Sequence, residues 1–468
     1  MRMTIQMTTD HTTEGGSAGV LAEVRTVFNT GRTRAVQWRE EQLRAIERMC
    51  EEREAEISEA LTRDLGRSTF EAWLGDVAST KAEAAFARKH LRRWMKPRRQ
   101  SLPLAQMPAR AWVQYDPLGV VLVIGPWNYP FFLCMSPVIA AVAAGNAVVV
   151  KPSELAPATS ELMARLVPLY LDPAAVRVVE GAADVTQDLM SQGFDHALFT
   201  GGTEVGRKIM AAAAPTLTPV TLELGGKSPV LVLADADLDV TARRIAWTKL
   251  LNSGQTCIAP DYILADRSIA KELTDKIVAT IAKFRADQPN PSLRIVNERQ
   301  FDRLVSILSA TEGTVVTGGG SDRATLSIEP TVVVDPGPDD SMMADEIFGP
   351  ILPIITVGST DEAVAFVNSR PKPLALYVFT SSQQKGRDLI DRMPSGGAVI
   401  NHIAMHCLVP QLPFGGVGAS GMGAYHGQWG FEALSHRRAV LAKPAKPDPS
   451  LLYPPYTDRA MKILRRLL

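Results

Sequence analysis

Cysteine is scarce in this sequence. Its 468 residues include four, Cys50, Cys134, Cys257 and Cys407, and they lie far apart. No pair has the short spacing of a cysteine-based metal site, and small secreted domains held by disulfides use cysteine far more densely. We therefore expect no metal centre, no disulfide and a cytoplasmic location. A lone cysteine is usually an inert buried side chain, and that is our interpretation of Cys50, Cys134 and Cys407.

Net charge is also lacking, since 50 Lys and Arg residues balance 50 Asp and Glu residues. This balance removes the electrostatic basis for binding nucleic acid or an anionic membrane. Residues 118–150 contain no charged side chain, but glycines and prolines divide this run into pieces too short to span a bilayer. Residues 1–19 are polar and lack the apolar core of a signal peptide, which predicts a disordered lead-in.

The sequence does contain a regular alternation of helices and apolar strands. Helical spacing runs through residues 20–96, and short apolar strands then alternate with helices, as is typical of parallel, doubly wound sheets. Strands are expected at 120–124, 147–150, 175–180 and 196–200, and then at 229–233, 262–265, 315–318, 331–334 and 351–357. A chain of this length divides into two or three domains. A Pro-rich linker at 443–449 and a short amphipathic helix at 456–468 are expected at its end.

The most informative segment is Asn252–Pro260, a Gly-containing turn that carries Cys257. Upstream, the unusual string Leu222–Pro229 carries Glu223. A thiol nucleophile and a carboxylate base are the two groups needed to form and then hydrolyse a thioester. The thiol needs a lowered pKa, which nearby N–H groups and a positive charge would supply, whereas an apolar setting raises the pKa of a carboxyl toward that of a useful base. The alternatives are an inert cysteine and a salt-bridged structural glutamate.

A dinucleotide site is predicted at residues 199–206, which follow a strand and open a helix. The spacing resembles G-x-G-x-x-G, with Gly201 and Gly206 at its ends, but Thr203 replaces the middle glycine. The backbone then approaches a pyrophosphate less closely, so a shifted binding mode is expected. The alternative is a Gly-rich helix entry made only for packing.

Two further loops follow predicted strands. Lys151 and Glu154 are expected at the carboxyl edge of the first sheet, where a carboxylate accepts hydrogen bonds from ribose hydroxyls. An exposed ion pair is the alternative interpretation. Asn128 lies between two prolines that fix its loop, and an amide held so rigidly suits a developing oxyanion. The alternative is a residue that only caps the next helix.

Two late strings complete the set, Glu346–Pro350 and the Gly-rich Pro413–Gly423, which is too rich in glycine for a helix or strand. Taken in order, all these strings resemble the NAD(P)-dependent aldehyde dehydrogenase superfamily from about Val20 to Ala442. The finer resemblance is to the class 3 branch and rests on residues 254–262 and 421–427. The sequence is similar to bacterial fatty, aromatic or coniferyl aldehyde dehydrogenases.

The resemblance implies a role for each singled-out residue. Cys257 would be the nucleophile and Glu223 the general base, and Asn128 would form an oxyanion hole with the backbone N–H of Cys257. The residues implied to hold NAD or NADP are Lys151, Glu154, Gly201, Gly202, Thr203, Gly206, Glu346 and Phe348, and Trp247 would line the aldehyde entrance. Gly202 stands where the family commonly has Ser or Asn, so a polar contact near the phosphates is expected to be missing.

The resemblance also implies an α/β fold with two doubly wound parallel-sheet domains, a small bridging β element and a homodimer. The expected boundaries are 1–19 for the lead-in, 20–100 and 116–222 for the dinucleotide-binding domain, 223–411 for the catalytic domain, 101–115 and 412–442 for the bridging element, and 443–468 for the tail.

The implied function is oxidation of an aldehyde to the carboxylic acid, on aromatic or medium- to long-chain aliphatic substrates, with no nucleic-acid partner and no membrane span. Two alternatives stay open. A CoA-acylating enzyme passes the acyl group to CoA and needs no base, so the presence of Glu223 argues against it. A non-catalytic cofactor-binding structural member needs no nucleophile, so the intact Cys257, Glu223 and Asn128 argue against it.

Overall fold

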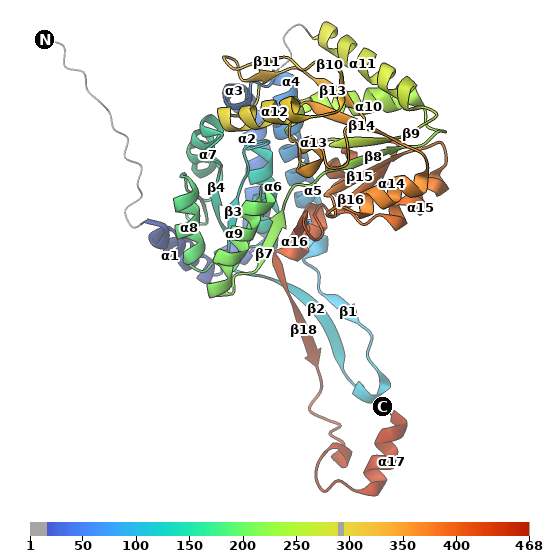
Figure 1. Cartoon of the computed structure of the whole chain (residues 1–468). Coiled ribbons are helices and arrows are strands. Elements are labelled where there is room, and N and C mark those ends of the chain that lie inside the picture. The colour runs from blue at the N-terminus through green and yellow to red at the C-terminus, as the bar shows by residue number, and fades with distance from the viewer. Residues whose placement is uncertain (1–15, 289–293, 468) are drawn as a thin grey trace, which may run out of the picture.

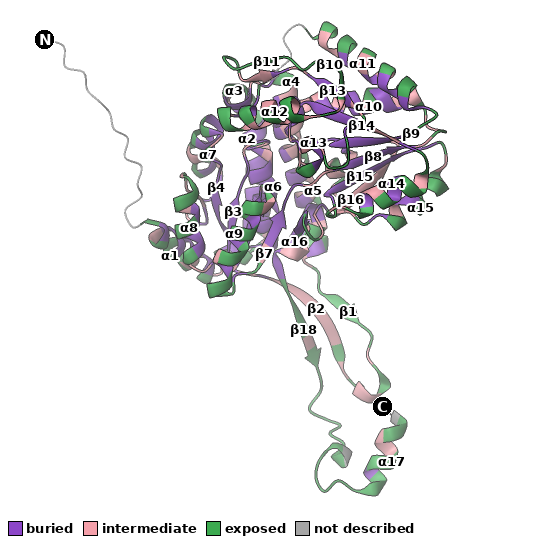
Figure 2. Cartoon of the chain, in the orientation of Figure 1, coloured by how far each residue is buried: buried purple, intermediate pink, exposed green. Residues whose placement is uncertain are grey.

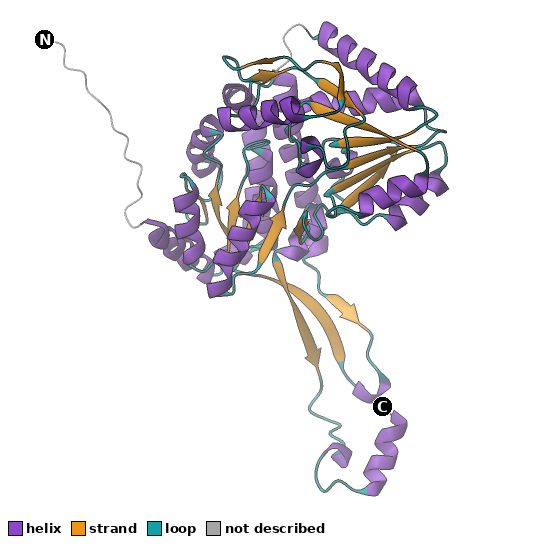
Figure 3. Ribbon diagram, viewed as in Figure 1, coloured by secondary structure: helices purple, strands orange, loops and turns teal. Residues whose placement is uncertain are grey.

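Two large sheets organise the chain, and a slender β arm projects away from them (Figure 1). The computed structural model describes residues 16–288 and 294–467. Helices pack around each sheet, so both sheets are interior layers (Figure 3). The predicted α/β architecture, with parallel sheets and an additional small β element, is confirmed. The assignment of residue ranges to named domains stays a prediction.

The first sheet has six strands in the order β17-β7-β6-β3-β4-β5. All neighbours are parallel except β17, which runs antiparallel to β7. The strands are β3 (Val120–Ile124), β4 (Ala147–Lys151), β5 (Val176–Val178), β6 (His196–Thr200), β7 (Val220–Glu223) and β17 (Gly421–Met422). The register sets Thr200 of β6 beside Glu223 of β7, so both residues lie at the carboxyl edge of the sheet.

The second sheet has seven strands in the order β10-β13-β14-β9-β8-β15-β16. Only β10 is antiparallel to its neighbour. The strands are β8 (Pro229–Val232), β9 (Tyr262–Asp266), β10 (Thr314–Thr317), β13 (Thr331–Val334), β14 (Ile351–Val357), β15 (Ala375–Phe379) and β16 (Gly397–Ile400). A small hairpin of β11 (Ser321–Asp322) and β12 (Ser327–Ile328) stands apart from it.

The helices fall into two sets that follow the two sheets along the chain. The first set is α1 (Gly16–Asn29), α2 (Val36–Glu52), α3 (Glu54–Leu65), α4 (Thr69–Ala72), α5 (Ser79–Trp94), α6 (Phe132–Ala144), α7 (Pro157–Tyr170), α8 (Ala183–Ser191) and α9 (Thr203–Ala213). The second is α10 (Leu238–Leu250), α11 (Ala270–Asp287), α12 (Glu298–Ala310), α13 (Ser341–Ala344), α14 (Thr360–Asn368) and α15 (Gln383–Arg392). Of the two remaining helices, α16 (Gly427–Ala433) packs against α5 and α6 of the first set, and α17 (Asp458–Leu467) belongs to neither.

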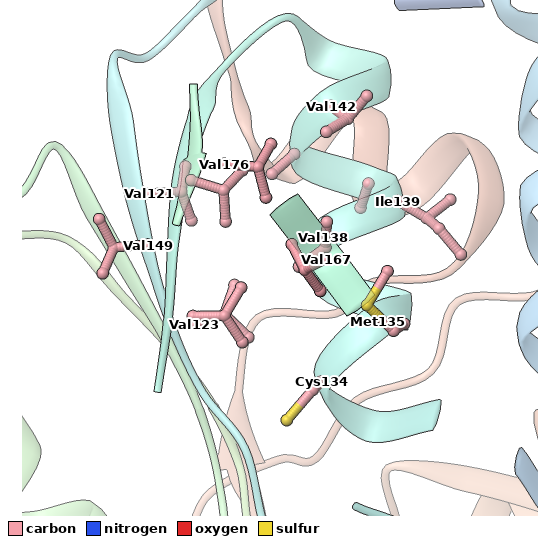
Figure 4. Close-up of a cluster of buried hydrophobic side chains, with 14 of the residues drawn as sticks. Val121, Val123, Cys134, Met135, Val138, Ile139, Val142, Val149, Val167 and Val176 are labelled. Atoms are coloured by element: carbon pink, nitrogen blue, oxygen red, sulfur yellow. The ribbon is translucent and has the colours of Figure 1, made fainter. Parts of the chain in front are cut away.

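The charge-free run at 118–150 forms the centre of the first core, as β3, α6 and β4. Figure 4 shows Val121 and Val123 of β3 facing Met135 and Val138 of α6. All four side chains are buried, and each contributes roughly 1.5–3 kcal/mol through removal from water. The run is therefore apolar because it lies inside the protein. Among the described helices, none combines the length and apolarity that crossing a bilayer requires.

The β arm consists of β1 (Arg98–Gln100), β2 (Arg110–Pro117) and β18 (Ser435–Ala442), all antiparallel. Its central strand β2 pairs along its whole length with β18, which comes from the far end of the sequence. The arm is largely exposed, in contrast to the two buried sheets (Figure 2). Helix α17 lies beyond it, away from both large sheets (Figure 1).

Several element boundaries differ from the sequence prediction. Helix α1 begins at Gly16, so the last four residues of the predicted lead-in at 1–19 are helical, and the rest of that prediction lies outside the described residues. The helix predicted from 136 begins earlier, at Phe132. The linker at 443–449 has no helix or strand, and the terminal helix covers Asp458–Leu467. The end of the predicted terminal helix, Leu468, lies outside the described residues.

Candidate active site

A cavity of about 1190 Å³ is lined by loops from both sheets, including those after β3, β4, β6 and β7. Loops at the carboxyl ends of parallel strands are where ligands bind in such folds. The predicted residues that line it are Cys257, Glu223, Asn128, Lys151, Glu154, Gly201, Gly202, Thr203, Glu346, Phe348 and Trp247. Gly206 does not line it. A Cβ at Gly206 would lie 2.6 Å from Leu224, so this glycine lets α9 pack closely on the segment after β7.

Cys257 follows a sharply wound turn at the end of α10. Asn252 and Ser253 have φ of 51° and 55°, and Gly254 has φ of 72°, so three successive residues are left-handed. A side chain at Gly254 would overlap the carbonyl oxygen of Gly349, so only glycine fits there. Left-handed non-glycine residues carry strain of order 1–3 kcal/mol each and are typical of functional turns. The turn brings the partly exposed Cys257 into the wall of the cavity.

The electrostatic surroundings of Cys257 favour the neutral thiol. Burial raises the pKa of Cys257 well above its usual range, and Glu346, Cys407 and Glu223 raise it further, while its own backbone N–H acts in the opposite direction. The sequence predicted that neighbouring N–H groups would lower the pKa of Cys257, but the described residues together raise it. A positive charge entering the cavity is needed to favour the thiolate.

Glu223 is the last residue of β7, and 2% of it is exposed. Both carboxyl oxygens are buried, and neither has a hydrogen-bond partner among the described residues. Burial raises the pKa of Glu223 well above its usual range, as expected for a carboxyl in an apolar setting. The salt-bridged alternative is wrong, because no cation pairs with this carboxyl in the described part of the chain. Its isolation suits a base that acts on water inside the cavity.

Asn128 lies in the loop between β3 and α6, and 4% of it is exposed. Its Nδ2 donates to the carbonyl oxygen of Gln255 at 3.1 Å, two residues before Cys257. Its own carbonyl oxygen accepts hydrogen bonds from Arg67 and from Nδ2 of Asn252. The N-cap of α6 is Phe131, so the helix-capping alternative for Asn128 is wrong. The side-chain amide is instead fixed beside the turn that carries the thiol.

At the other end of the cavity, Lys151 is buried and Glu154 is half exposed. Lys151 Nζ donates to Glu154 Oε2 at 3.0 Å and to the carbonyl oxygen of Gly181 at 2.8 Å. The pair is therefore more than the exposed ion pair of the alternative interpretation, because its cation is held inside the wall. The carboxylate keeps a side open to the cavity, as ribose binding requires.

The loop after β6 leaves space for phosphates. Gly202 is the N-cap of α9 and no side chain caps the helix, so its first N–H groups are available to an anion. A Cβ at Gly202 would have no atom within 4 Å, whereas the hydroxyl of Thr200 is buried without a partner among the described residues. Free helix N–H groups, open space and an unpaired hydroxyl fit the pyrophosphate of NAD or NADP.

Glu346 lines the cavity beside the loop that follows β7. A side chain at Gly225 would overlap Glu346 Oε2, so this glycine makes room for the carboxyl. Burial raises the pKa of Glu346 to about 8, and Asp261 raises it as well, while the N–H of Gly226 acts in the opposite direction. The strings Leu222–Pro229 and Glu346–Pro350 are therefore in contact here.

Two aromatic groups on the cavity wall were also predicted from the sequence. Phe348 has φ of 49° and meets the ring of Trp127 edge to face, with ring centroids 5.3 Å apart. Trp247 reaches the cavity from α10. The wall therefore combines a few polar groups with large apolar surfaces, as is usual for sites that bind small molecules.

Sequence reasoning missed several residues of the site. Arg67 is buried between Asp76 and the ring of Tyr129, and it donates to Asn252 Oδ1 at 3.0 Å as well as to the carbonyl oxygen of Asn128. It thus ties the oxyanion loop to the nucleophile turn. Arg67 is a single arginine after a helix, and nothing in the surrounding sequence indicates that it links these two loops.

The remaining cysteines divide. Cys50 and Cys134 are buried, and burial raises the pKa of each to about 12, in agreement with their interpretation as inert thiols. For Cys407, the prediction of a buried side chain is wrong, because this residue is partly exposed and lines the cavity. Tyr425 and His426 line it too, although the sequence drew attention to their segment only as a motif.

Known proteins and solved structures resemble this chain over most of its length. The model of the aldehyde dehydrogenase family matches residues 10–440. The chain is 46% identical over 458 residues to aldehyde dehydrogenase family 3 member H1 of Arabidopsis thaliana, spanning 97% of this chain and 95% of that protein. It is 44% identical to the dimeric NADP-preferring aldehyde dehydrogenase of Mus musculus, spanning 94% and 97%. The substrate-bound structure of Staphylococcus aureus AldH superposes with a TM-score of 0.92 at 39% identity, covering 96% and 99%.

Proposed function

The chain belongs to the aldehyde dehydrogenase family, and on that premise we propose that Cys257, Glu223 and Asn128 perform its reaction on aromatic or medium- to long-chain aliphatic aldehydes. It is an NAD(P)-dependent aldehyde dehydrogenase, which oxidises an aldehyde to the carboxylic acid. The observation that supports the assignment is that all three side chains line one cavity together with the predicted cofactor residues.

Acylation of the enzyme begins at the thiol. The Sγ of Cys257, once deprotonated, bonds to the aldehyde carbon, and negative charge develops on the carbonyl oxygen. The amide of Asn128, with the backbone N–H of Cys257, stabilises that charge. NAD or NADP, when bound, would supply the acceptor for the hydrogen of the aldehyde carbon and its electron pair. The thiolate of Cys257 would be favoured by a cation bound in the cavity, because the described protein neighbours that act on its pKa are acidic or neutral.

Hydrolysis of the thioester on Cys257 is the task of Glu223. Its carboxylate takes a proton from water, the water oxygen bonds to the acyl carbon, and the carbon–sulfur bond breaks. The acid leaves and the thiolate is restored. The absence of any hydrogen-bond partner for the Glu223 oxygens within the described residues supports this role, because neither oxygen is engaged by another protein group.

The cofactor residues divide between two parts of the cavity. Lys151 and Glu154 hold the adenosine ribose, and the loop Gly201–Thr203 binds the pyrophosphate. At the reactive end, Glu346 binds the nicotinamide ribose and Phe348 packs near the ring. Support comes from the free N–H groups at the start of α9 and from the half-exposed carboxylate of Glu154. Trp247 lines the entrance for the aldehyde.

We also propose a homodimer, which the projecting β arm supports, and a cytoplasmic location, which the few and widely spaced cysteines support. The outer strands of the arm are exposed and have little to pack against within their own chain. A relative that matches 94% of this chain is named as dimeric. Sedimentation of the purified protein tests the dimer, which is contradicted by a monomer at micromolar concentration.

Trapping the acyl group on the enzyme tests the assignment of residues. Wild-type protein mixed with cofactor and benzaldehyde or hexanal should reduce the cofactor and release the acid. In Glu223→Gln, mass spectrometry of the digested protein should find the acyl group on the peptide that contains Cys257. An adduct on Cys407 instead would contradict the assignment. Formation of acyl-CoA in preference to acid when CoA is added would favour the CoA-acylating alternative.

A further inference from the structure

Two neighbouring side chains near the end of the sequence present unpaired polar atoms at the cavity. Tyr425 is 1% exposed and His426 is 3% exposed, and both line the cavity that contains Cys257. The Tyr425 hydroxyl and the His426 Nε2 are buried, and neither has a hydrogen-bond partner among the described residues. An unpaired buried polar group costs about 1–3 kcal/mol, so such groups are rare in folded proteins unless a ligand satisfies them.

The backbone fixes both side chains in place. Tyr425 forms an antiparallel bridge with Phe414, with N–H to carbonyl distances of 3.0 and 2.8 Å in the two directions. His426 follows with φ of 82°, a left-handed conformation that is unfavourable for so bulky a residue. Strain of this kind persists only where the surrounding structure holds it, and it concentrates at binding sites.

The hydroxyl of Tyr425 stays protonated in these surroundings. Burial raises the pKa of Tyr425 well above its usual range, and Glu223, Glu83 and Cys257 raise it further. Tyr425 lines the same cavity as the proposed base and the nucleophile. A neutral phenol both donates and accepts hydrogen bonds, as does a neutral imidazole through its two ring nitrogens.

The surfaces around these two atoms are aromatic. The ring of Phe414 meets Tyr425 edge to face at 6.2 Å between centroids and lies 5.3 Å from His426. On another side, Phe132 meets His426 edge to face at 6.1 Å. Both phenylalanines line the cavity. A substrate chain or ring beside these two residues would therefore contact the phenylalanine rings as well as the hydroxyl and Nε2.

We propose that Tyr425 and His426 form a polar subsite in the aldehyde cavity that binds a hydroxyl group of the substrate. The inference rests on the proposed function and specifies it further: the preferred substrates are hydroxyl-bearing aldehydes rather than pure hydrocarbon aldehydes of the same length. A hydrocarbon aldehyde excludes water and leaves both polar atoms unpaired, whereas a hydroxyl satisfies them. Sites built to bind a substrate hydroxyl discriminate against analogues that lack it for this reason.

Matched substrates test the subsite. The kcat/KM of the wild-type protein is measured for benzaldehyde and for 2-, 3- and 4-hydroxybenzaldehyde, since the three isomers present the hydroxyl in different directions. At least one isomer should exceed benzaldehyde by about tenfold or more, which corresponds to one net hydrogen bond of about 1.4 kcal/mol. Tyr425→Phe should remove that preference, so that the ratio of kcat/KM for the favoured isomer to kcat/KM for benzaldehyde falls to about one.

A second tyrosine serves as the matched control. Tyr377 is also buried, but its hydroxyl donates to the carbonyl oxygen of Ile258 at 2.6 Å, next to Cys257. Tyr377→Phe should therefore change the values for all four aldehydes by the same factor and keep their ratio. Inhibition of the wild-type protein by 3-hydroxybenzamide and benzamide gives a readout that needs no variant, and the hydroxyl compound should inhibit more strongly.

The outcomes separate this inference from the function on which it rests. Wild-type protein that reduces no cofactor with any of the four aldehydes contradicts the proposed function itself. Protein that oxidises all four with equal kcat/KM and binds both benzamides equally retains the function but overturns the polar subsite. Equal losses for all four aldehydes in Tyr425→Phe also overturn it, because they would mean that the hydroxyl serves Glu223 or Cys257 and not the substrate.

Discussion

The two ends of the cavity differ in how their charged groups are paired. At the cofactor end, Lys151 donates to Glu154 and to a backbone carbonyl, so its charge is satisfied within the protein. At the reactive end, the carboxyl of Glu223 is buried with no partner among the described residues, and its pKa is raised. At the cofactor end the charged groups are already paired within the protein. At the reactive end the carboxyl can form hydrogen bonds only with bound water or substrate.

This difference predicts which substitutions change KM and which change kcat. A change at the paired end removes binding energy that is equal before and during the reaction, so it raises KM and leaves kcat. A change at the unpaired end removes an interaction made only during the reaction, so it lowers kcat. The five substitutions below examine that division, from the largest expected effect to the smallest.

Replacing the nucleophile should have the largest effect. Cys257→Ala is expected to lower kcat/KM by about 10⁴-fold or more, because no covalent intermediate can form. The dissociation constant of the cofactor, measured by quenching of tryptophan fluorescence, should change little. Cys50→Ala makes the same chemical change in the core and should stay active. Substantial aldehyde oxidation by Cys257→Ala would remove the distinction between the two ends.

Replacing the base should separate the two chemical steps. Glu223→Gln is expected to reduce the cofactor in one rapid burst, close to one equivalent per active site, and then to turn over about 10³-fold more slowly than wild type. Stopped-flow absorbance of the reduced cofactor measures both phases. Glu272→Gln, on the exposed side of α11, is the matched control. Steady turnover at the wild-type rate would reject Glu223 as the base.

Removing the amide should slow acylation. Asn128→Ala is expected to lower kcat by about 10²- to 10³-fold, as is usual when one donor of an oxyanion hole is lost. The burst seen in Glu223→Gln should become slow in the double variant, because the amide acts before the thioester forms. A change in KM for the cofactor with kcat intact would assign Asn128 to the paired end of the cavity instead.

The paired end should respond in KM. Glu154→Ala is expected to raise KM for NAD by about tenfold, the loss of one hydrogen bond to a charged group, with kcat at saturating cofactor near the wild-type value. Initial rates over a range of NAD and NADP concentrations measure this effect. If kcat falls as strongly as in Asn128→Ala, the two ends are not functionally distinct.

The smallest effect concerns stability. Burial raises the pKa of Glu346 to about 8 from a usual value of 4.5, so the folded state holds this proton more tightly than the unfolded state. The resulting stabilisation is complete below the lower value and is lost as the pH rises through the higher one. Glu346→Gln should therefore gain a few degrees in Tm relative to wild type as the pH rises toward 9, and differential scanning fluorimetry measures this. Parallel pH dependence of both proteins would contradict the raised pKa.

Much of the site could be predicted from the sequence because its residues lie in short segments with an unusual local composition. Lys151 ends an apolar strand, Gly201 directly follows another, and Asn128 lies in the loop after a third. The carboxyl ends of parallel strands converge on one edge of the sheet. Cys257 stands in a turn whose glycine has no substitute. Local composition therefore carries information about a site when its residues belong to loops that the sheet itself positions.

Other features depended on contacts between distant segments and had no local signal. Arg67 meets Asn128 and Asn252 across separations of 61 and 185 residues. The four-residue strand β7, which carries Glu223, is too short to be distinguished by periodicity. Gly206 fits a fingerprint spacing, yet it packs on Leu224 because the angle between α9 and β7 brings them together. Cys407 looked like a core thiol, since its neighbours in the cavity come from elsewhere in the chain.

The pairing of β17 with β7 has a consequence for how the protein is made. Gly421 lies beside Glu223 in the first sheet, and the N–H of Leu224 donates to the carbonyl oxygen of Ser420 at 3.1 Å. During synthesis, the strand that carries the base thus remains an open edge until the segment around Gly421 has left the ribosome and folded onto it. About two hundred residues separate the two partners, so the edge beside the carboxyl closes through one of the longest-range contacts of the sheet.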